Sequence, residues 1–551
     1  MNFFMKKLIS VILILTYLLL GCNNSKKADK IVSGKSRISS KITYSNLVLK
    51  EENLIDYFKS FPEEESIIDE VNLFYKNRNY QFAWFNNDGM ITSISIFQNQ
   101  LQSYHDNYLD NSFINNKIER LISKIQHDKV NFNNNESRLT ELEIVLTTTF
   151  FKYSKKVYNG IYGNPNNLDW YIPKNKKNYQ ILLDSLVVSN KSDSSWEPSN
   201  KYYVALKQKL IFYREIEKKG GFPKIVLTKK VFNKSEKDSC LLNVKNYLVL
   251  SGDLKYNNKS IEFDDSLVKA VTLFQSRMGL NNQGILGEAT TKEMNVPISF
   301  RIKQIMINME RLRWFPDEVE SNFLLINIPE FKLHVFENKN NVMDFKVIVG
   351  KEATKTSIFR GDVSQIIINP YWNVPTSIVR NEIVPKLKLN SNYLAKNNME
   401  VLSGNTIINP STINWNNYGS TIPYSIRQKP GDDNALGKMK FIFPNNFSIY
   451  LHDTPSKSIF NQSKRAFSHG CIRVENPMKL ALYILKNNPN WNQEIPQSII
   501  NNKKTFNIQI KPALPVYIVY FTAWVGSSGE INFRNDLYNM DHRLEKEIFK
   551  N

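Results

Sequence analysis

The spacing of hydrophobic residues divides the body of this chain into three regions of different expected structure. Across residues 46–235, apolar side chains recur three or four positions apart, which is the period of one face of an α-helix. The clearest runs are Ile67, Ile68, Val71, Phe74 and Tyr75, followed by Leu142, Val145 and Leu146. The pattern predicts a mainly helical scaffold domain, and no group of residues within it suggests catalysis.

Residues 240–298 predict a compact helical unit with clear start and stop signals. The stretch Phe-Asp-Asp-Ser at 263–266 supplies capping residues before an apolar helical face, and Gly279 follows that face as a stop signal. The face consists of Val268, Val271, Phe274 and Met278. After a turn at 281–287, a second helix is expected to begin near Ala289.

Residues 320–505 change to short β-rich runs bounded by Gly, Pro and Asn. β-branched residues and patches of alternating polarity favour a mostly antiparallel β domain. The runs lie at 323–328, 332–336, 345–350 and 365–369. Farther along, residues 386–420 are rich in Asn and Ser and weakly periodic, which predicts an inserted lid. Strand character returns near 516–520 within a C-terminal extension, residues 506–551.

The start of the chain indicates export. Two lysines precede a 13-residue apolar stretch, Leu8–Leu20, which is shorter than the ~20 residues needed to span a bilayer. The stretch ends in Leu-Leu-Gly-Cys, which resembles a bacterial lipobox with Cys22 as the lipidated residue. We therefore predict a signal peptide at 1–22, a flexible basic tether at 23–45 and a periplasmic lipoprotein anchored in the cell envelope. An uncleaved membrane anchor is the alternative.

Composition changes this picture in two respects. The 551 residues carry a formal charge of +20, which favours anionic partners. Export removes nucleic acid from that set, which leaves anionic envelope polymers, lipid headgroups or simply a solvated lysine-rich surface. Three cysteines are too few for a disulfide-stapled scaffold.

One stretch combines residues suited to nucleophilic chemistry. Cys471 lies in Ser-His-Gly-Cys-Ile-Arg, and His452 lies upstream in Tyr-Leu-His-Asp-Thr-Pro. A helix is predicted to begin at Pro477, so the cysteine would lie just before a helix N-terminus and near Arg473, and both features favour a thiolate. A nearby histidine can accept the thiol proton. Gly470 lets the backbone come close to a substrate carbonyl, where N–H groups can hold an oxyanion.

Three other interpretations of Cys471 stay open from the residues alone. It could be a buried structural cysteine. It could bind zinc together with His452 and His469, although no fourth ligand is evident. It could form a disulfide with Cys240, which the exported compartment would allow.

The motifs are similar to those of a known family. Ser-His-Gly-Cys-Ile-Arg with an upstream histidine resembles the signature of L,D-transpeptidases, which have a YkuD-like catalytic domain. The stretches at 308–314, 369–387, 427–446, 450–455 and 515–525 resemble the large, multi-domain YcbB-type branch. Residues 240–298 resemble a small helical peptidoglycan-binding domain. The resemblance implies an α+β multi-domain fold: helical scaffold, peptidoglycan-binding-like domain, then a mostly antiparallel β catalytic domain with a lid insertion.

The resemblance also implies roles for individual residues. Cys471 would be the nucleophile and His452 the general base and acid, with a backbone carbonyl orienting the histidine. The oxyanion region and pocket would involve Ser468, His469, Gly470 and Arg473. The substrate pocket would be lined by Tyr450, Trp372 and Asn373.

The implied reaction is acyl transfer between peptidoglycan stem peptides. The cysteine would attack a tetrapeptide stem, release D-alanine and form a thioester, which the amine of a second stem would resolve as a 3→3 cross-link. No metal or other cofactor is expected, and the protein is expected to be a monomer that carbapenems acylate. The alternatives are L,D-carboxypeptidase activity, anchoring of a protein to the wall by the same cysteine, or a non-catalytic wall-binding lipoprotein.

Overall fold

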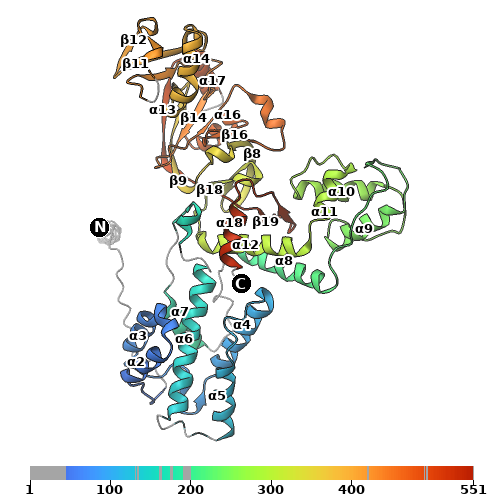
Figure 1. Ribbon diagram of the computed structural model, residues 1–551, viewed down its shortest axis with the longest axis vertical. Helices are drawn as coiled ribbons and strands as arrows, with labels where there is room; N and C mark the ends of the chain where they lie inside the picture. Colours follow the sequence, from blue (N-terminus) through green and yellow to red (C-terminus); the bar gives the residue numbers. More distant parts are fainter. Residues whose placement is uncertain are drawn as a thin grey trace, which may run out of the picture. The chain divides into compact units, whose positions relative to one another are not determined.

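The protein is described by a computed structural model (Figure 1). It describes residues 45–128, 130, 132, 136–160, 164–173, 178–189, 200–418, 421–488, 491 and 494–549. The predicted signal peptide, Cys22 and nearly all of the predicted tether lie outside these residues. No helix in the described ranges is both long enough and apolar enough to cross a membrane. Contacts divide the chain into two units, residues 1–91 with 120–145 and residues 92–119 with 146–551.

The first unit is organised around a buried carboxylate. Helices α2 (Glu51–Ser60) and α3 (Ile68–Asn77) precede a short hairpin of β1 (Phe85–Asn86) and β2 (Gly89–Met90). The fully buried Glu143 accepts hydrogen bonds from the backbone N–H groups of Ala83 and Trp84, at 2.6 and 3.0 Å. These bonds satisfy a group that would otherwise be costly to bury.

Helices dominate the rest of the region between 46 and 235, as the periodicity predicts. They are α4 (Ser93–Tyr108), α5 (Asn116–His127), α6 (Ser137–Asn159), α7 (Tyr179–Ser189) and α8 (Lys201–Lys218). One short strand, β3 (Trp170–Tyr171), pairs in parallel with β9 (Ile358–Ile368). The scaffold region therefore contributes an edge strand to the central sheet.

The small helical unit has the two predicted helices, α10 (Asp265–Arg277) and α11 (Glu288–Met294). A further helix, α9 (Cys240–Leu250), precedes them. The Asp264 side chain caps α10 by accepting a hydrogen bond from Leu267 N at 2.9 Å. The strand β4 (Val231–Phe232) pairs with β5 (Leu286–Gly287), so the unit extends upstream of residue 240.

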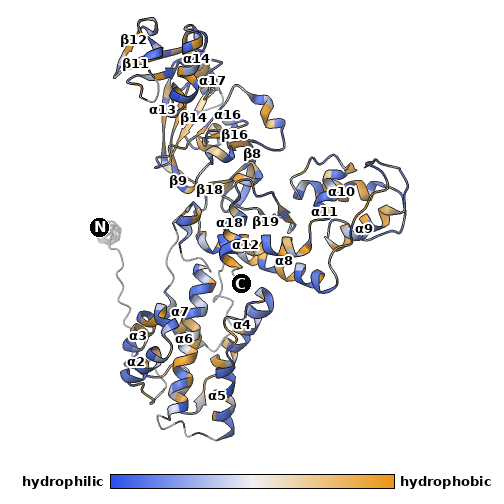
Figure 2. Cartoon of the chain, viewed as in Figure 1, coloured by the Kyte–Doolittle hydropathy of each residue, from blue (hydrophilic) through white to orange (hydrophobic). Residues whose placement is uncertain are grey.

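The central sheet contains ten strands among the described residues, in the order β14-β15-β17-β8-β7-β6-β18-β9-β3, with β16 paired to β8. The strands not yet defined are β6 (Phe323–Asn327), β7 (Lys332–Glu337), β8 (Asn340–Gly350), β14 (Met439–Ile442), β15 (Leu451–His452), β16 (Ala466–Ser468), β17 (Ile472–Val474) and β18 (Phe506–Val519). All four predicted runs are strands. Most pairings are antiparallel, while β15–β17, β6–β18, β3–β9 and β8–β16 are parallel. Figure 2 shows apolar residues, in orange, along strands of this sheet and on α12 (Ile298–Trp314).

The predicted lid is part of a larger insert between β9 and β14. Its strands, β10 (Trp372–Asn373), β11 (Met399–Ser403), β12 (Thr406–Ile408) and β13 (Ser425–Gln428), form a separate sheet in the order β10-β13-β11-β12. Its helices are α13 (Thr376–Ile378), a π-helical turn (Val379–Ile383), α14 (Val384–Leu389) and α15 (Tyr393–Lys396). The insert has its own core, which includes Val374, Val379, Leu387, Val401, Trp415 and Ile426. Residues 386–420 alone would lack part of this core.

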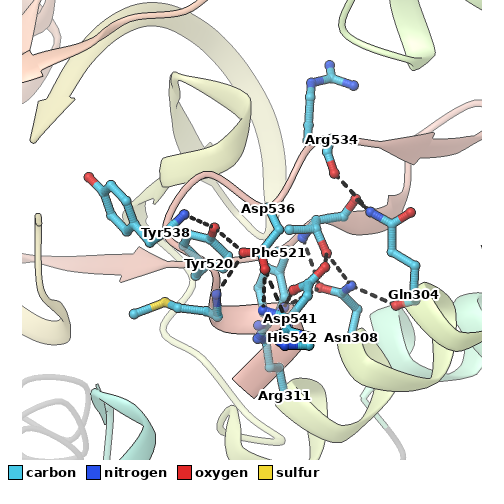
Figure 3. Close-up of polar contacts among 12 residues, drawn as sticks. Gln304, Asn308, Arg311, Tyr520, Phe521, Arg534, Asp536, Tyr538, Asp541 and His542 are labelled. Carbon is cyan, nitrogen blue, oxygen red and sulfur yellow. Dashed lines mark hydrogen bonds and ion pairs between the residues drawn. The ribbon is translucent and has the colours of Figure 1, made fainter. Parts of the chain in front are cut away.

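The C-terminal segment is held against α12 by buried polar contacts (Figure 3). Asn308 accepts a hydrogen bond from Thr522 N at 2.9 Å, and Arg311 pairs with Asp541 at 2.5 Å. Gln304 donates to the carbonyl of Arg534 at 2.8 Å. These contacts fix the hairpin of β19 (Ala523–Val525) and β20 (Ile531–Phe533) and the start of α18 (Met540–Ile548).

Candidate active site

Three adjacent strands place the candidate residues on one face of the sheet. In the register, Lys440 of β14 is opposite His452 of β15, and His452 is opposite Arg473 of β17. Residues opposite each other in paired strands share a face, and so do residues two positions apart in one strand. Tyr450 and Cys471 lie two positions before His452 and Arg473, and the hydrogen bond from Ile472 N to Tyr450 O, at 3.1 Å, extends the pairing to them. Two residues predicted as catalytic, Cys471 and His452, therefore lie on the same face.

His452 is a buried, neutral imidazole with one nitrogen committed. Its side chain is 5% exposed, and Nδ1 lies 2.5 Å from the backbone carbonyl oxygen of Asp453. A proton on Nδ1 satisfies that carbonyl and leaves Nε2 as the acceptor. Burial, with a smaller contribution from the positive charges of Arg473 and Lys440, lowers the pKa of His452 to about 3. The expected carbonyl orients the histidine, while the Asp453 side chain bonds Lys438 N and Lys457 instead.

Cys471 is a free thiol whose environment differs from the prediction. Its Sγ donates to the carbonyl of Ser448 at 3.6 Å. Burial raises the pKa of Cys471, against the opposing effects of hydrogen bonds from Tyr450 and of the positive charges on Lys440 and Arg473. Arg473 thus favours a thiolate as predicted, but desolvation of the charged form outweighs this effect, so the net shift of the Cys471 pKa is upward. Helix α16 (Pro477–Ile484) begins where predicted, but β17 lies between it and the thiol.

The loop before Cys471 is held by hydrogen bonds of its own. Ser468 Oγ donates to the carbonyl of Cys471 at 2.6 Å and accepts from Gly470 N at 3.1 Å. Gly470 has a φ of +112°, a conformation that side chains with a Cβ rarely adopt. Ser468 and Gly470 therefore shape the loop, and the N–H of Gly470 is already used.

A second layer supports this loop from the C-terminal segment. Thr356 Oγ1 donates to the carbonyl of Gly470 at 2.7 Å and accepts from Gly350 N at 2.9 Å. The Tyr538 hydroxyl donates to the carbonyl of Gly350 at 2.6 Å and accepts from Thr356 N at 3.3 Å. Tyr538, which is labelled in Figure 3, thus positions the nucleophile loop through Thr356. No local sequence signal marks this contact.

Two residues of the insert, Glu382 and Trp372, reach the site. Glu382 lies in the π-helical turn, and one of its carboxylate oxygens is 2.9 Å from Nε2 of the partly exposed His469. Trp372 donates a hydrogen bond to the Tyr450 hydroxyl, which lowers the pKa of Tyr450 against a larger increase from burial. Asn373 is exposed on β10 opposite Arg427, and no contact brings it to the thiol. The structure thus brings Trp372 and Tyr450 together.

The alternative interpretations of Cys471 gain no support. Cys240 and Cys471 are both free, so they do not form a disulfide. Among the described residues, His, Cys, Asp and Glu side chains form no group of three or more that could hold a metal. The motifs did not point to Lys440, which lies opposite His452 on the neighbouring strand β14. Its only signal was a lysine inside a short apolar alternation, Met-Lys-Phe-Ile.

Comparison with known proteins agrees with this geometry. Residues 321–492 match the YkuD family, the L,D-transpeptidase catalytic domain, and residues 69–210 match a scaffold domain family. The chain therefore contains an L,D-transpeptidase catalytic domain of the YkuD family together with a scaffold domain. A protein of Haemophilus influenzae named "Putative L,D-transpeptidase" is 32% identical over 289 residues. That match covers 52% of this chain and spans only about half, 56%, of the relative.

Solved structures give a weaker likeness. L,D-transpeptidases from Xylanimonas cellulosilytica and Stackebrandtia nassauensis are each 11% identical to this chain. They cover 53% and 52% of it and 100% and 94% of their own chains, with TM-scores of 0.18 and 0.20.

Proposed function

We propose that this protein is a peptidoglycan L,D-transpeptidase that forms 3→3 cross-links by cysteine acyl transfer from tetrapeptide stems. One observation carries the proposal: within a YkuD catalytic domain, a free thiol and a neutral imidazole share one face of adjacent strands. The imidazole is oriented by a backbone carbonyl so that Nε2 can take a proton. This is the arrangement that a cysteine nucleophile with a general base requires.

The protonation states suggest how the first step proceeds. Since Cys471 and His452 are both neutral at rest, the thiol proton passes to His452 Nε2 as sulfur attacks the carbonyl carbon of the third stem residue. The C–N bond to D-alanine breaks, the imidazolium gives its proton to the departing amine, and a thioester remains. The amine of an acceptor stem then attacks the thioester, His452 takes its proton, and that proton returns to sulfur.

The insert is proposed to act as a lid that favours aminolysis over hydrolysis by excluding water. The lid proposal is supported by the contact between Glu382 of the insert and His469, which lies in the loop just before Cys471. Replacing Glu382 by Gln should weaken that contact and raise the yield of free tripeptide relative to cross-linked dimer. An unchanged product ratio would remove the lid from the mechanism.

The remaining proposals concern the setting of the enzyme. Cys22 would carry the lipid anchor of a periplasmic lipoprotein, and residues 240–298 would act as a peptidoglycan-binding domain. Radiolabelled palmitate that reaches the parent protein but not Cys22→Ala tests the first. Co-sedimentation of the full chain with purified sacculi, compared with a chain lacking residues 240–298, tests the second.

The central test is intact mass after incubation with a carbapenem, which resembles the acyl donor. We expect one adduct on the parent, none on Cys471→Ala, and slowed formation on His452→Ala. Cys240→Ala is the matched control and should keep the adduct. A well-folded parent that forms no adduct would contradict the proposal and would favour a non-catalytic wall-binding lipoprotein.

Product analysis then separates the acyl acceptors. Purified tetrapeptide muropeptides should yield dimers linked between the third residues, with release of D-alanine. Tripeptide as the sole product would indicate an L,D-carboxypeptidase. Turnover only with an added protein acceptor would indicate anchoring of protein to the wall.

A further inference from the structure

Two cations lie beside the candidate thiol without a carboxylate to balance them. Lys440 and Arg473 flank His452 on the same face of β14, β15 and β17. Across the described part of the chain, neither forms an ion pair with an acidic side chain, although most buried arginines elsewhere do. Burial lowers the pKa of both groups, which reflects the cost of keeping them charged there.

Their geometry points both groups at the site. The Lys440 ammonium lies 3.8 Å from the centre of the Tyr450 ring, and Tyr450 in turn hydrogen-bonds the Cys471 thiol. Arg473 Nε is buried and has no hydrogen-bond partner among the described residues. A guanidinium N–H that remains unsatisfied and an ammonium held over a ring together leave donors for an anion.

We propose that Lys440 and Arg473 form an anion subsite that binds the terminal carboxylate of the acyl donor. The identity of the donor rests on the proposed function; the anion subsite itself rests on the two unbalanced cations. In a stem peptide that ends in D-alanine, a single carbon atom separates the terminal carboxylate from the nitrogen of the bond to be cleaved. A carboxylate bound by these cations would therefore bring the adjacent carbonyl carbon close to Cys471.

The subsite also gives the cations a reason to be half-buried without an acidic partner. A cation without a partner is costly to bury, and a bound carboxylate would offset that cost at the moment of binding. Lysine provides a compact charge, whereas arginine provides directed N–H donors, so the two can hold one carboxylate from two sides. A donor that lacks the carboxylate would leave both cations desolvated and unpaired, which gives selectivity.

The first experiment needs no peptidoglycan. In a Cys240→Ala background, Cys471 is alkylated with iodoacetate, which is an anion, and with iodoacetamide, which is neutral. Since both reagents attack the same thiolate, the ratio of their rates cancels changes in the thiol pKa. We expect Lys440→Met to lower the iodoacetate-to-iodoacetamide ratio by roughly tenfold.

Two further variants control for charge and folding. Lys438→Met removes a lysine two positions away whose ammonium pairs with Asp432 at 2.5 Å, and it should leave the ratio unchanged. Lys440→Arg retains the charge and should keep the ratio close to the parent value. An equal ratio in the parent and in a folded Lys440→Met variant would overturn the subsite. So would an equal decrease in Lys438→Met.

A second experiment assigns the ligand. Tetrapeptide donors that end in a carboxylate or in a carboxamide are compared in the parent and in Lys440→Met. We expect kcat/KM to fall roughly tenfold for the carboxylate donor only. An equal decrease for both donors would overturn the proposal, because Lys440 would then act on the thiol alone. If the parent used neither donor while the alkylation ratio still changed, the proposed function would fail and the anion subsite would stand.

Discussion

Two histidines in the same sheet, the partly buried His334 and the buried His452, have opposite electrostatic surroundings. His334 on β7 lies between carboxylates, with Nε2 2.9 Å from Glu330 and Nδ1 2.8 Å from Asp344. Their charges and hydrogen bonds raise its pKa to about 9, against the lowering effect of burial. His452 on β15 is flanked by Lys440 and Arg473, and its pKa falls to about 3. One imidazole is held charged and the other is held neutral.

The difference separates a structural site from a chemical one. Around His334 every charge has an opposite partner, so protonation stabilises the fold. Around His452 the charges have the same sign, so protonation would destabilise the fold and the ring is available to accept a proton. Unbalanced buried charge lowers stability, and proteins retain such arrangements chiefly at functional sites.

The largest effect should come from removing the imidazole that is held neutral. His452→Ala should slow acylation of Cys471 by roughly 10²–10⁴-fold, since a positioned general base contributes about that much. Rates of carbapenem adduct formation, followed by mass, give the measurement. Added imidazole should restore part of the rate, because the substitution leaves space for the ring. No rescue and an equal loss of folded protein would indicate a structural role.

The histidine that is held charged should matter for stability alone. His334→Gln should remove about 3 kcal/mol of unfolding free energy at pH 6, where the unfolded state also holds a proton. Because the raised pKa stabilises the fold below pH 6.5 and the gain is lost as pH rises through about 9, the difference should shrink at pH 9.5. Urea unfolding at both pH values tests this, with the exposed His542→Gln as control. A difference that does not depend on pH would contradict the assignment.

The smallest effect concerns the pH dependence of acylation. With its pKa lowered to about 3, His452 remains a base far below pH 6.5, so the acid limb of the rate profile should lie well below that value. Lys440→Met removes one nearby cation and should move the acid limb upward, by about one pH unit or less. Initial acylation rates between pH 4 and 8 give the measurement. A parent midpoint near pH 6.5 would contradict the neutral-pair mechanism.

The parts of the site that the sequence predicts are local in the chain. Cys471 and His452 lie in two short motifs, and Pro477 starts α16 where expected. Strands such as β6 and β7 are recognisable from their β-branched runs. The predicted lid at 386–420 leaves out the first helical turns of the insert. Their apolar residues, including Val379, have the spacing of any amphipathic helix, so the sequence does not mark them as part of the insert.

What the sequence does not predict depends on pairing between distant segments. Lys440 is half-buried only because β14 lies beside β15, and an isolated lysine in an apolar alternation is typical of an exposed strand face. The pKa of Cys471 depends on how completely the folded pocket excludes water, which no motif encodes. The support of the nucleophile loop by Tyr538 requires three segments to meet.

That last contact has a consequence for the order of events during synthesis. Gly470 is held by Thr356, and Thr356 is held by Tyr538, which the ribosome adds well after Cys471. Until Tyr538 emerges and packs, the loop that carries the nucleophile lacks its outer support. The reactive cysteine therefore reaches its final geometry late, so an unfinished chain exposes an immature thiol and not a working site.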